Sequence, residues 1–358
     1  MSAWKSLLRT VTADLEEQAS SRTLRTGYEW NGTNPLHVVP YRSFGTSSRV
    51  SFRGRVLIDR GIASGRDETP AWRNLSDTMK RLASAELARA EVKATFRGES
   101  LDITANDEGY FEAVFSTNIP GNECGWQSAE LELVEPRNPQ LVRATGHSLV
   151  PPVSAEYGVI SDIDDTIVRT EATSAVRMLR TVLTRNARSR LPFEGVADFY
   201  RALVGGLSGV AANPIFYVSS GPWNLYDVIS DYLEIQQIPV GPLMMQDFGI
   251  DRERFIHASH DDHKLSCIRA ILDSYPSMKF VLIGDSGQRD PEIYEQVVDL
   301  DPGRILAIYI RDVTVEARDA AVVKIGKTLT ERGVTMILAP DTVAAVDHAT
   351  KKGLIAAM

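Results

Sequence analysis

Residues 157–166 read YGVISDIDDT, an apolar run of strand-forming residues that ends in three aspartates and a threonine. Further apolar runs follow it, and segments of helical periodicity such as Leu265, Ile268 and Leu272 lie between them. Buried strands that alternate with helices are typical of a parallel sheet covered on both faces. The sequence therefore predicts an α/β unit with a Rossmann-like parallel sheet. The further runs are IFYVS (215–219), GPLMMQ (241–246), KFVLIGD (279–285), RILAIYI (304–310) and VTMILA (334–339).

The first half of the chain has a β-rich pattern instead. The segments EVKATF (91–96) and SLDIT (100–104) flank Arg97–Gly98–Glu99 and predict a hairpin. Short strands separated by turns predict a β-sandwich, and residues 66–90 interrupt them with a polar, partly helical insertion. The other strand candidates are residues 49–58, 110–115, 128–134 and 140–149.

The pattern changes at Pro151–Pro152, which can continue neither a helix nor a central strand. A chain of 358 residues is also longer than one domain of about 100–200 residues. We therefore expect a helical or flexible lead over residues 1–33, a β-sandwich-like domain over 34–150 and the α/β domain over 153–358.

Composition restricts the class of protein. The hydrophobic fraction of 43% and the charged fraction of 24% are those of a folded chain. No run of about 18 apolar residues predicts a membrane span, and the first residues lack the apolar core of a secretory signal. Two cysteines are too few for a disulfide framework, so a reducing, cytoplasmic location is expected. The net charge of −8 argues against a general nucleic-acid binder.

Polar residues follow several of the predicted parallel strands, where the binding sites of open α/β sheets form. Asp162, Asp164 and Thr166 follow the first run, Ser219–Ser220–Gly221 follows the second, and Asp285 and Asp290 follow the fourth. Lys264 precedes the helical pattern that leads into the fourth run. This set suits phosphoryl transfer to an aspartate, because a carboxylate can attack phosphorus and a divalent cation with a lysine can neutralise the charge. A second aspartate can move the proton of the leaving group.

The strings GVISDIDDTI, FYVSSGPWNLY, DHK and IGDSGQRDPEIY resemble the motifs of the haloacid dehalogenase superfamily of phosphohydrolases. They are most similar to the actin-patch phosphatidate phosphatase family and its bacterial relatives, over roughly residues 150–340. The resemblance implies a Mg²⁺-dependent phosphatase that forms an aspartyl-phosphate, with phosphatidate or a related lipid phosphate as its substrate.

The resemblance also implies residue roles. Asp162 would be the nucleophile and a metal ligand, and Asp164 would be the general acid/base with its carbonyl on the metal. Lys264 would orient the nucleophile and the phosphate. The expected metal ligands are Asp162, Asp164, Asp285 and Asp290, the last as a ligand or an outer partner. The expected substrate-binding residues are Thr166, Ser219, Ser220, Gly221 and Lys264.

Alternative interpretations apply to three segments and to one residue. Residues 162–173 do not fit an EF-hand calcium loop, because Ile167 and Thr173 replace its glycine and glutamate. The histidines at 257, 260 and 263 can suggest zinc, but their spacing differs from that of a helical His pair. The arginine-rich segment 169–190 fits either a packed helix or a peripheral contact with an anionic membrane. Asp290, directly before Pro291, also fits a helix N-cap.

Two other functions stay open at this stage. One is a phosphatase for a soluble metabolite or a phosphoprotein. The other is a membrane-recruited binding module whose phosphatase site is vestigial.

Overall fold

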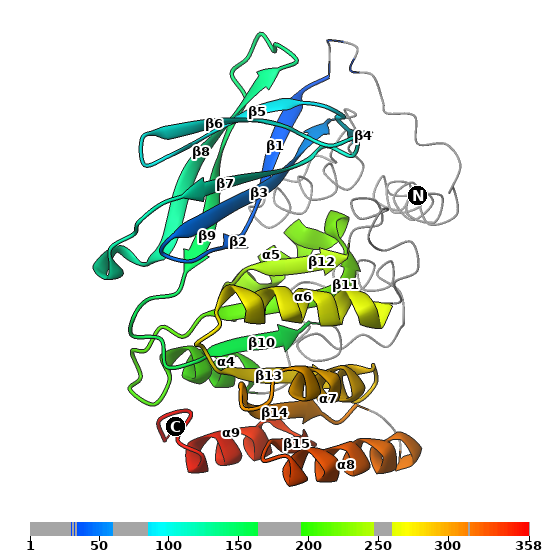
Figure 1. Cartoon of the computed structure of the whole chain (residues 1–358). Coiled ribbons are helices and arrows are strands. Elements are labelled where there is room, and N and C mark those ends of the chain that lie inside the picture. Colours follow the sequence, from blue (N-terminus) through cyan, green and yellow to red (C-terminus); the bar gives the residue numbers. More distant parts are fainter. Residues whose placement is uncertain are drawn as a thin grey trace.

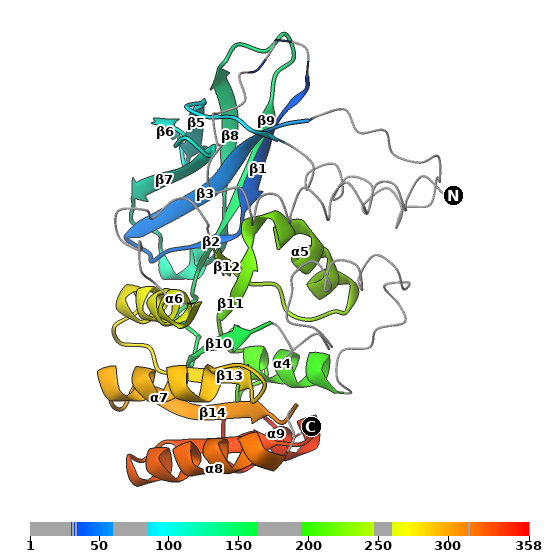
Figure 2. The same cartoon turned by 90° about the vertical axis from the view of Figure 1, so that its right-hand side faces the viewer.

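A computed structural model describes residues 30, 32, 34–59, 85–163, 195–246, 260–313 and 316–357. Figures 1 and 2 show two units, with the β-rich first half of the chain lying on one end of an α/β second half. We call residues 34–150 the β unit and residues 157–357 the α/β unit. Pro151 and Pro152 lie between them, outside any helix or strand.

The β unit consists of two sheets. In the first, β3 pairs antiparallel with three other strands. The second has the order β2-β9-β8-β5-β6, and its one parallel pair is β2 with β9. The first sheet contains β1 (Leu36–Tyr41), β3 (Arg49–Ile58), β4 (Ala85–Glu86) and β7 (Tyr110–Ser116). The second contains β2 (Ser43–Phe44), β5 (Glu91–Phe96), β6 (Glu99–Thr104), β8 (Gly125–Glu135) and β9 (Arg143–Val150).

The predicted hairpin is confirmed. Phe96 pairs with Glu99, so the turn is Arg97–Gly98, and both turn residues have positive φ angles of 51° and 86°. Two left-handed residues match the twist of the flanking strands, and glycine adopts this conformation without strain. Phe52, Phe115, Val92 and Leu131 come from both sheets and belong to one hydrophobic cluster.

The α/β unit contains a six-stranded sheet with the order β12-β11-β10-β13-β14-β15. Every neighbouring pair is parallel, which confirms the predicted sheet. Numbered within this unit, the strand order is 3-2-1-4-5-6, the Rossmann order. The strands are β10 (Gly158–Asp162), β11 (Ile215–Pro222), β12 (Leu243–Gln246), β13 (Phe280–Asp285), β14 (Ile305–Arg311) and β15 (Thr335–Ala339).

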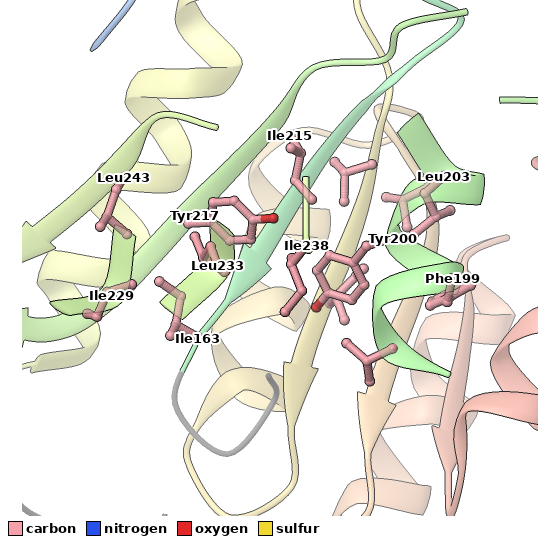
Figure 3. Packing of buried hydrophobic residues seen from close by; sticks show 14 of the residues in the cluster. Ile163, Phe199, Tyr200, Leu203, Ile215, Tyr217, Ile229, Leu233, Ile238 and Leu243 are labelled. Atoms are coloured by element: carbon pink, nitrogen blue, oxygen red, sulfur yellow. The ribbon is translucent and has the colours of Figure 1, made fainter. Parts of the chain in front are cut away.

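Helices cover both faces of this sheet because successive strand residues point to opposite sides. Val159 and Tyr217 pack with α4, α5 and α9 in one cluster, part of which Figure 3 shows around Tyr200 and Tyr217. Ile160 and Phe216 pack with α6, α7 and α8 in another. The helices are α4 (Val196–Gly205), α5 (Tyr226–Ile235), α6 (His260–Ser274), α7 (Asp290–Leu300), α8 (Glu316–Glu331) and α9 (Thr342–Lys351), and the short 3-10 helix η2 is Trp223–Leu225.

No helix among these described segments is both long and apolar enough to cross a membrane.

Candidate active site

The candidate site lies where the strand order reverses. Asp162 is the last residue of β10 and Asp285 is the last residue of β13, and these two strands are neighbours. The chain continues from β10 to β11 on one side of this pair and from β13 to β14 on the other side. At such a switch point the carboxyl ends of the two strands border a crevice, and Rossmann-like sheets bind their ligands there. The fold therefore brings the predicted aspartates of the first and fourth runs to one place.

Lys264 joins two of the acidic residues. Its Nζ lies 2.8 Å from Asp162 Oδ1 and 2.5 Å from Asp290 Oδ1. The lysine and the aspartates Asp162, Asp285 and Asp290 are each at most 2% exposed. Removing one partner of a buried ion pair usually costs about 3–5 kcal/mol, so α6 is tied firmly to β10 and α7.

The pKa of Lys264 follows from these contacts. Burial alone would lower the pKa of the ammonium group, but the carboxylates of Asp162 and Asp290 raise it above its usual value. Lys264 is therefore fully protonated at neutral pH and acts as a fixed positive charge beside Asp162.

Asp290 uses its second oxygen on the backbone of the next acidic residue. Its Oδ2 accepts a hydrogen bond from the Asp285 N–H at 3.0 Å. The helix α7 begins at Asp290, with Pro291 in its first turn, and no side-chain cap is present. The N-cap interpretation of Asp290 is therefore wrong, because this carboxylate turns toward Lys264 and the Asp285 backbone instead of the helix amides.

The carboxylate of Asp285 is fixed by the turn that follows β13. Its Oδ1 accepts hydrogen bonds from Gly287 N–H at 2.7 Å and from Gln288 N–H at 2.8 Å. Backbone donors hold an ionised carboxylate in one orientation and favour its charged form.

Three carboxylates and a single lysine make a suitable cation site. One oxygen from each of Asp162, Asp285 and Asp290 lies within 4.8 Å of the others, so the cluster could hold a metal ion. Two of these three buried carboxylates, those of Asp162 and Asp290, contact the buried ammonium of Lys264, and buried carboxylates are stabilised when they are paired or bind a cation. A hard divalent cation with a preference for oxygen ligands fits both the donor set and the charge.

Ser219 lies on the neighbouring strand. Asp162 pairs with Val218 in the parallel ladder, so Ser219 stands one residue further toward the carboxyl edge. Ser219 is fully buried, whereas Ser220 and Gly221 are partly exposed. The Gly221 N–H donates to Ser219 Oγ at 3.0 Å, a local Ser turn inside β11 at the point where its pairing with β12 shifts register between Val218 and Pro222. We call residues 219–221 the Ser219 turn.

Ser161 and Tyr200, which the sequence did not reveal as site residues, hold the backbone of Asp162 in place. Ser161 Oγ donates to the Asp162 carbonyl at 2.7 Å, and Tyr200 Oη lies 2.7 Å from Ser161 Oγ. Burial raises the pKa of Tyr200 well above its usual value, so its phenol keeps the proton that it donates to Ser161. The chain Tyr200–Ser161–Asp162 fixes the backbone at the end of β10.

Some predicted features lie outside the described residues: Asp164, Thr166, the segment 169–190, the insertion up to residue 84 and His257. His260 begins α6, and His263 has its Nε2 3.5 Å from Cys267 Sγ, one turn along the same helix.

The fold and the site together define a Rossmann-like domain with a buried acid–lysine cluster at its switch point. Residues 157–312 match the family described as "Phosphatidate phosphatase APP1, catalytic domain". This part of the chain is therefore a phosphatidate phosphatase APP1-like catalytic domain, as its motifs indicated.

Two fungal relatives match parts of the chain. It is 36% identical over 155 residues to phosphatidate phosphatase APP1 of Saccharomyces cerevisiae, which covers 43% of this chain and 25% of that protein. It is 28% identical over 217 residues to an uncharacterized protein of Schizosaccharomyces pombe, which covers 59% of this chain and 34% of that protein. The match thus spans about a quarter of the length of the first relative and about a third of the length of the second.

Among solved structures, a carbohydrate acetylesterase from Xanthomonas citri aligns at 11% identity over 77% of this chain and 68% of that chain, with a TM-score of 0.29. A similarity at that level carries no argument about this protein.

Proposed function

We propose that this protein is a Mg²⁺-dependent phosphatase that hydrolyses phosphomonoesters through an aspartyl-phosphate on Asp162. The observation that carries the proposal is the buried contact of Lys264 with both Asp162 and Asp290, next to Asp285, at the switch point of the sheet. The match of this same segment to the APP1 catalytic domain agrees with it.

The first chemical step would use Asp162 as the nucleophile. A carboxylate oxygen of Asp162 forms a bond to phosphorus while the bond from phosphorus to the ester oxygen breaks. Asp164, two residues further on, gives its proton to the leaving oxygen. In the second step Asp164 takes a proton from water, the water oxygen attacks phosphorus, and inorganic phosphate leaves with the Asp162 carboxylate restored.

The surrounding residues would lower the charge repulsion in both steps. Lys264 holds Asp162 in place and presents its positive charge toward the phosphoryl group. The Ser219 hydroxyl, with the backbone at Ser220 and Gly221, would hold phosphoryl oxygens, and Thr166 would stabilise the loop after β10.

A divalent cation would be held by Asp162, Asp285 and the Asp164 carbonyl, and when bound it would supply a Lewis acid for the phosphoryl oxygens. Asp290 fits an outer position better, because Lys264 and the Asp285 N–H engage both of its oxygens. Mg²⁺ typically takes only one or two carboxylates and fills its other positions with water and phosphate, which suits this set.

For the substrate we propose phosphatidate or a related lipid phosphate, the class in the description of the matching family. The finer fold assignment is a haloacid dehalogenase-like domain preceded by a β-sandwich. Under this proposal the protein is cytoplasmic, and the segment 169–190 gives it peripheral contact with anionic membranes.

The proposal is tested with the purified full chain on phosphatidate in vesicles, a sugar phosphate and a phosphopeptide, with Mg²⁺ or with excess chelator. We expect hydrolysis of the lipid phosphate that stops with chelator and returns with Mg²⁺. Hydrolysis restricted to the sugar phosphate or the phosphopeptide would replace the lipid substrate by a soluble one. No hydrolysis of any ester, or full activity in excess chelator, would contradict the proposed mechanism.

A further inference from the structure

We propose that Tyr41 and Arg42 of the β unit are positioning residues for the Ser219 turn of the α/β unit. The β unit then contributes to phosphatase activity by holding part of the site in position, and is not only an appended binding module. The inference rests on the proposed function of Ser219 in holding the phosphoryl group. It concerns residues more than 170 positions away from that serine in the chain.

Tyr41 packs directly on the segment that follows the Ser219 turn. Its ring is stacked on Trp223, with the ring centroids 4.4 Å apart and the planes 28° apart. It also contacts Tyr226, with the centroids 4.7 Å apart. Tyr41 is 5% exposed and belongs to the same hydrophobic cluster as Leu225, Tyr226 and Ile229. A residue of β1 is thus built into the core of the α/β unit.

Arg42 holds the same segment by polar contacts. Its backbone N–H donates to Tyr226 Oη at 2.7 Å, and its guanidinium contacts Ser230 Oγ and the Glu234 carboxylate. Burial raises the pKa of Tyr226 to about 12, so the phenol stays neutral at physiological pH. Residues at three successive positions along α5, four residues apart, are therefore connected to Arg42, which lies between β1 and β2.

The held segment is continuous with the Ser219 turn. Trp223 is four residues after Ser219, and the turn between them is closed by the Gly221 N–H on Ser219 Oγ. A Cβ atom at Gly221 would lie 3.5 Å from Met245 Cε and 3.7 Å from Leu225 Cδ1, so the turn is within van der Waals contact of β12 and η2. A shift of Trp223 consequently moves Ser219 unless this turn deforms.

The other site residues are held by different elements. Asp162, Lys264, Asp285 and Asp290 belong to β10, α6, β13 and α7, and their mutual contacts do not pass through η2 or α5. Loss of the Tyr41 contact is therefore expected to weaken phosphoryl binding while the affinity for the metal is retained. A general loss of fold would affect both.

The test compares Tyr41→Leu and Trp223→Leu in the full chain, alone and combined with Ser219→Ala. Arg42→Gln is the milder variant in case Tyr41→Leu does not fold. We expect kcat/KM to fall about 10–100-fold, because displacement by about 1 Å has effects of that size. In the Ser219→Ala background the same substitutions should lower kcat/KM by less than about 2-fold, because the effects of residues that act through one group are not additive. The Mg²⁺ concentration for half-maximal activity should not change.

A second measurement is independent of activity. Hydrogen exchange of the amides in residues 217–226 should become faster in Tyr41→Leu, while exchange in residues 280–294 should stay as in the wild type. Phe44→Leu is the matched control, because Phe44 packs on Phe216 and Tyr275 against the opposite face of the sheet. It should lower stability without changing exchange over residues 217–226 or kcat/KM.

The outcomes separate the two proposals. Unchanged exchange over residues 217–226 in Tyr41→Leu overturns the positioning role, and so does an undiminished effect in the Ser219→Ala background. A different result is faster exchange over residues 217–226 in Tyr41→Leu together with a wild type that hydrolyses no phosphomonoester. That result supports the positioning role of Tyr41 and refutes the proposed function. An equal response to Phe44→Leu would also overturn the inference, because the contact would then be a general docking contact.

Discussion

Asp162 and Asp164 stand two residues apart, and the proposed chemistry needs them in opposite protonation states. Asp162 must be ionised to attack phosphorus, and the contact with protonated Lys264 stabilises that charge. Asp164 must carry a proton when the ester bond breaks. The two residues are therefore expected to respond differently to substitution.

Asp162→Asn should abolish turnover of every ester, because no phosphoryl-enzyme can form. Asp164→Asn should slow an ordinary ester by about 10²–10⁴-fold but slow p-nitrophenyl phosphate much less in the first step, since its leaving group needs no proton. The measurement is the ratio of the two kcat/KM values in each variant. Equal losses on both esters for Asp164→Asn, or near-normal turnover by Asp162→Asn, would show that the roles are assigned wrongly.

The residues of this site differ in how far the sequence could reveal them. Asp162, Lys264, Asp285 and Asp290 were predicted because they follow or precede apolar runs in a recognisable order, and the structure brings all four together. Tyr200 and Ser161 were not predicted, because a tyrosine in a helix and a serine inside a strand carry no spacing signal. Their hydrogen bond joins residues 39 positions apart, which only the packing of α4 on β10 creates.

At the scale of elements, the junction of β13 and α7 depends on a close approach. A Cβ atom at Gly284 would lie 2.5 Å from Asp290 Oδ2 and 2.7 Å from Asp290 Cβ, so a side chain there must displace the carboxylate that Lys264 and the Asp285 N–H share.

Gly284→Ala should therefore lower the free energy of unfolding by roughly 1–3 kcal/mol, the usual effect of overpacking. It should also lower kcat/KM by about 10²-fold. Gly205→Ala, at the end of α4 with nothing within 4 Å of the new atom, is the control and should be neutral or stabilising by up to about 1 kcal/mol. Thermal unfolding and steady-state kinetics measure both effects. A Gly284→Ala variant with wild-type stability and activity would contradict this prediction, because α7 could then move away from residue 284 without loss of stability or of the Asp290 contacts.

The sequence predicted the elements of the α/β unit better than those of the β unit. Each of the six apolar runs became a strand within a few residues of its expected bounds, because strands buried on both faces are apolar throughout. The strand β1 was not predicted, because Pro40 interrupts its pattern. The proline is tolerated there because β1 is an edge strand, which among the described residues pairs with β3 alone. Strands of two residues, such as β2, are too short to show any period.

At the scale of the whole molecule, the two units share their hydrophobic interior. Val39, Tyr41 and Leu57 of the β unit lie in the cluster that contains residues of α4, α5 and α9. On the opposite face of the sheet, Phe44 packs on the cluster of α6, and Tyr275 Oη donates to the Gly45 carbonyl at 2.9 Å. Neither contact could be expected from the sequence, because each joins a short segment of the β unit to residues of the α/β unit that are distant in the chain.

A shared interior predicts that the full chain unfolds in one transition. Unfolding of either unit alone would expose the aromatic residues that the other covers, so partly unfolded states are costly relative to complete unfolding. Calorimetry should give equal calorimetric and van't Hoff enthalpies for the wild type. Tyr41→Asp combined with Phe44→Asp places charges in both contacts and should split the transition into two. Leu141→Asp, at a site in the β unit that is 64% exposed, should leave the single transition intact. Two separate transitions in the wild type would mean that the units fold independently, and the Ser219 turn would then have to be positioned by the α/β unit alone.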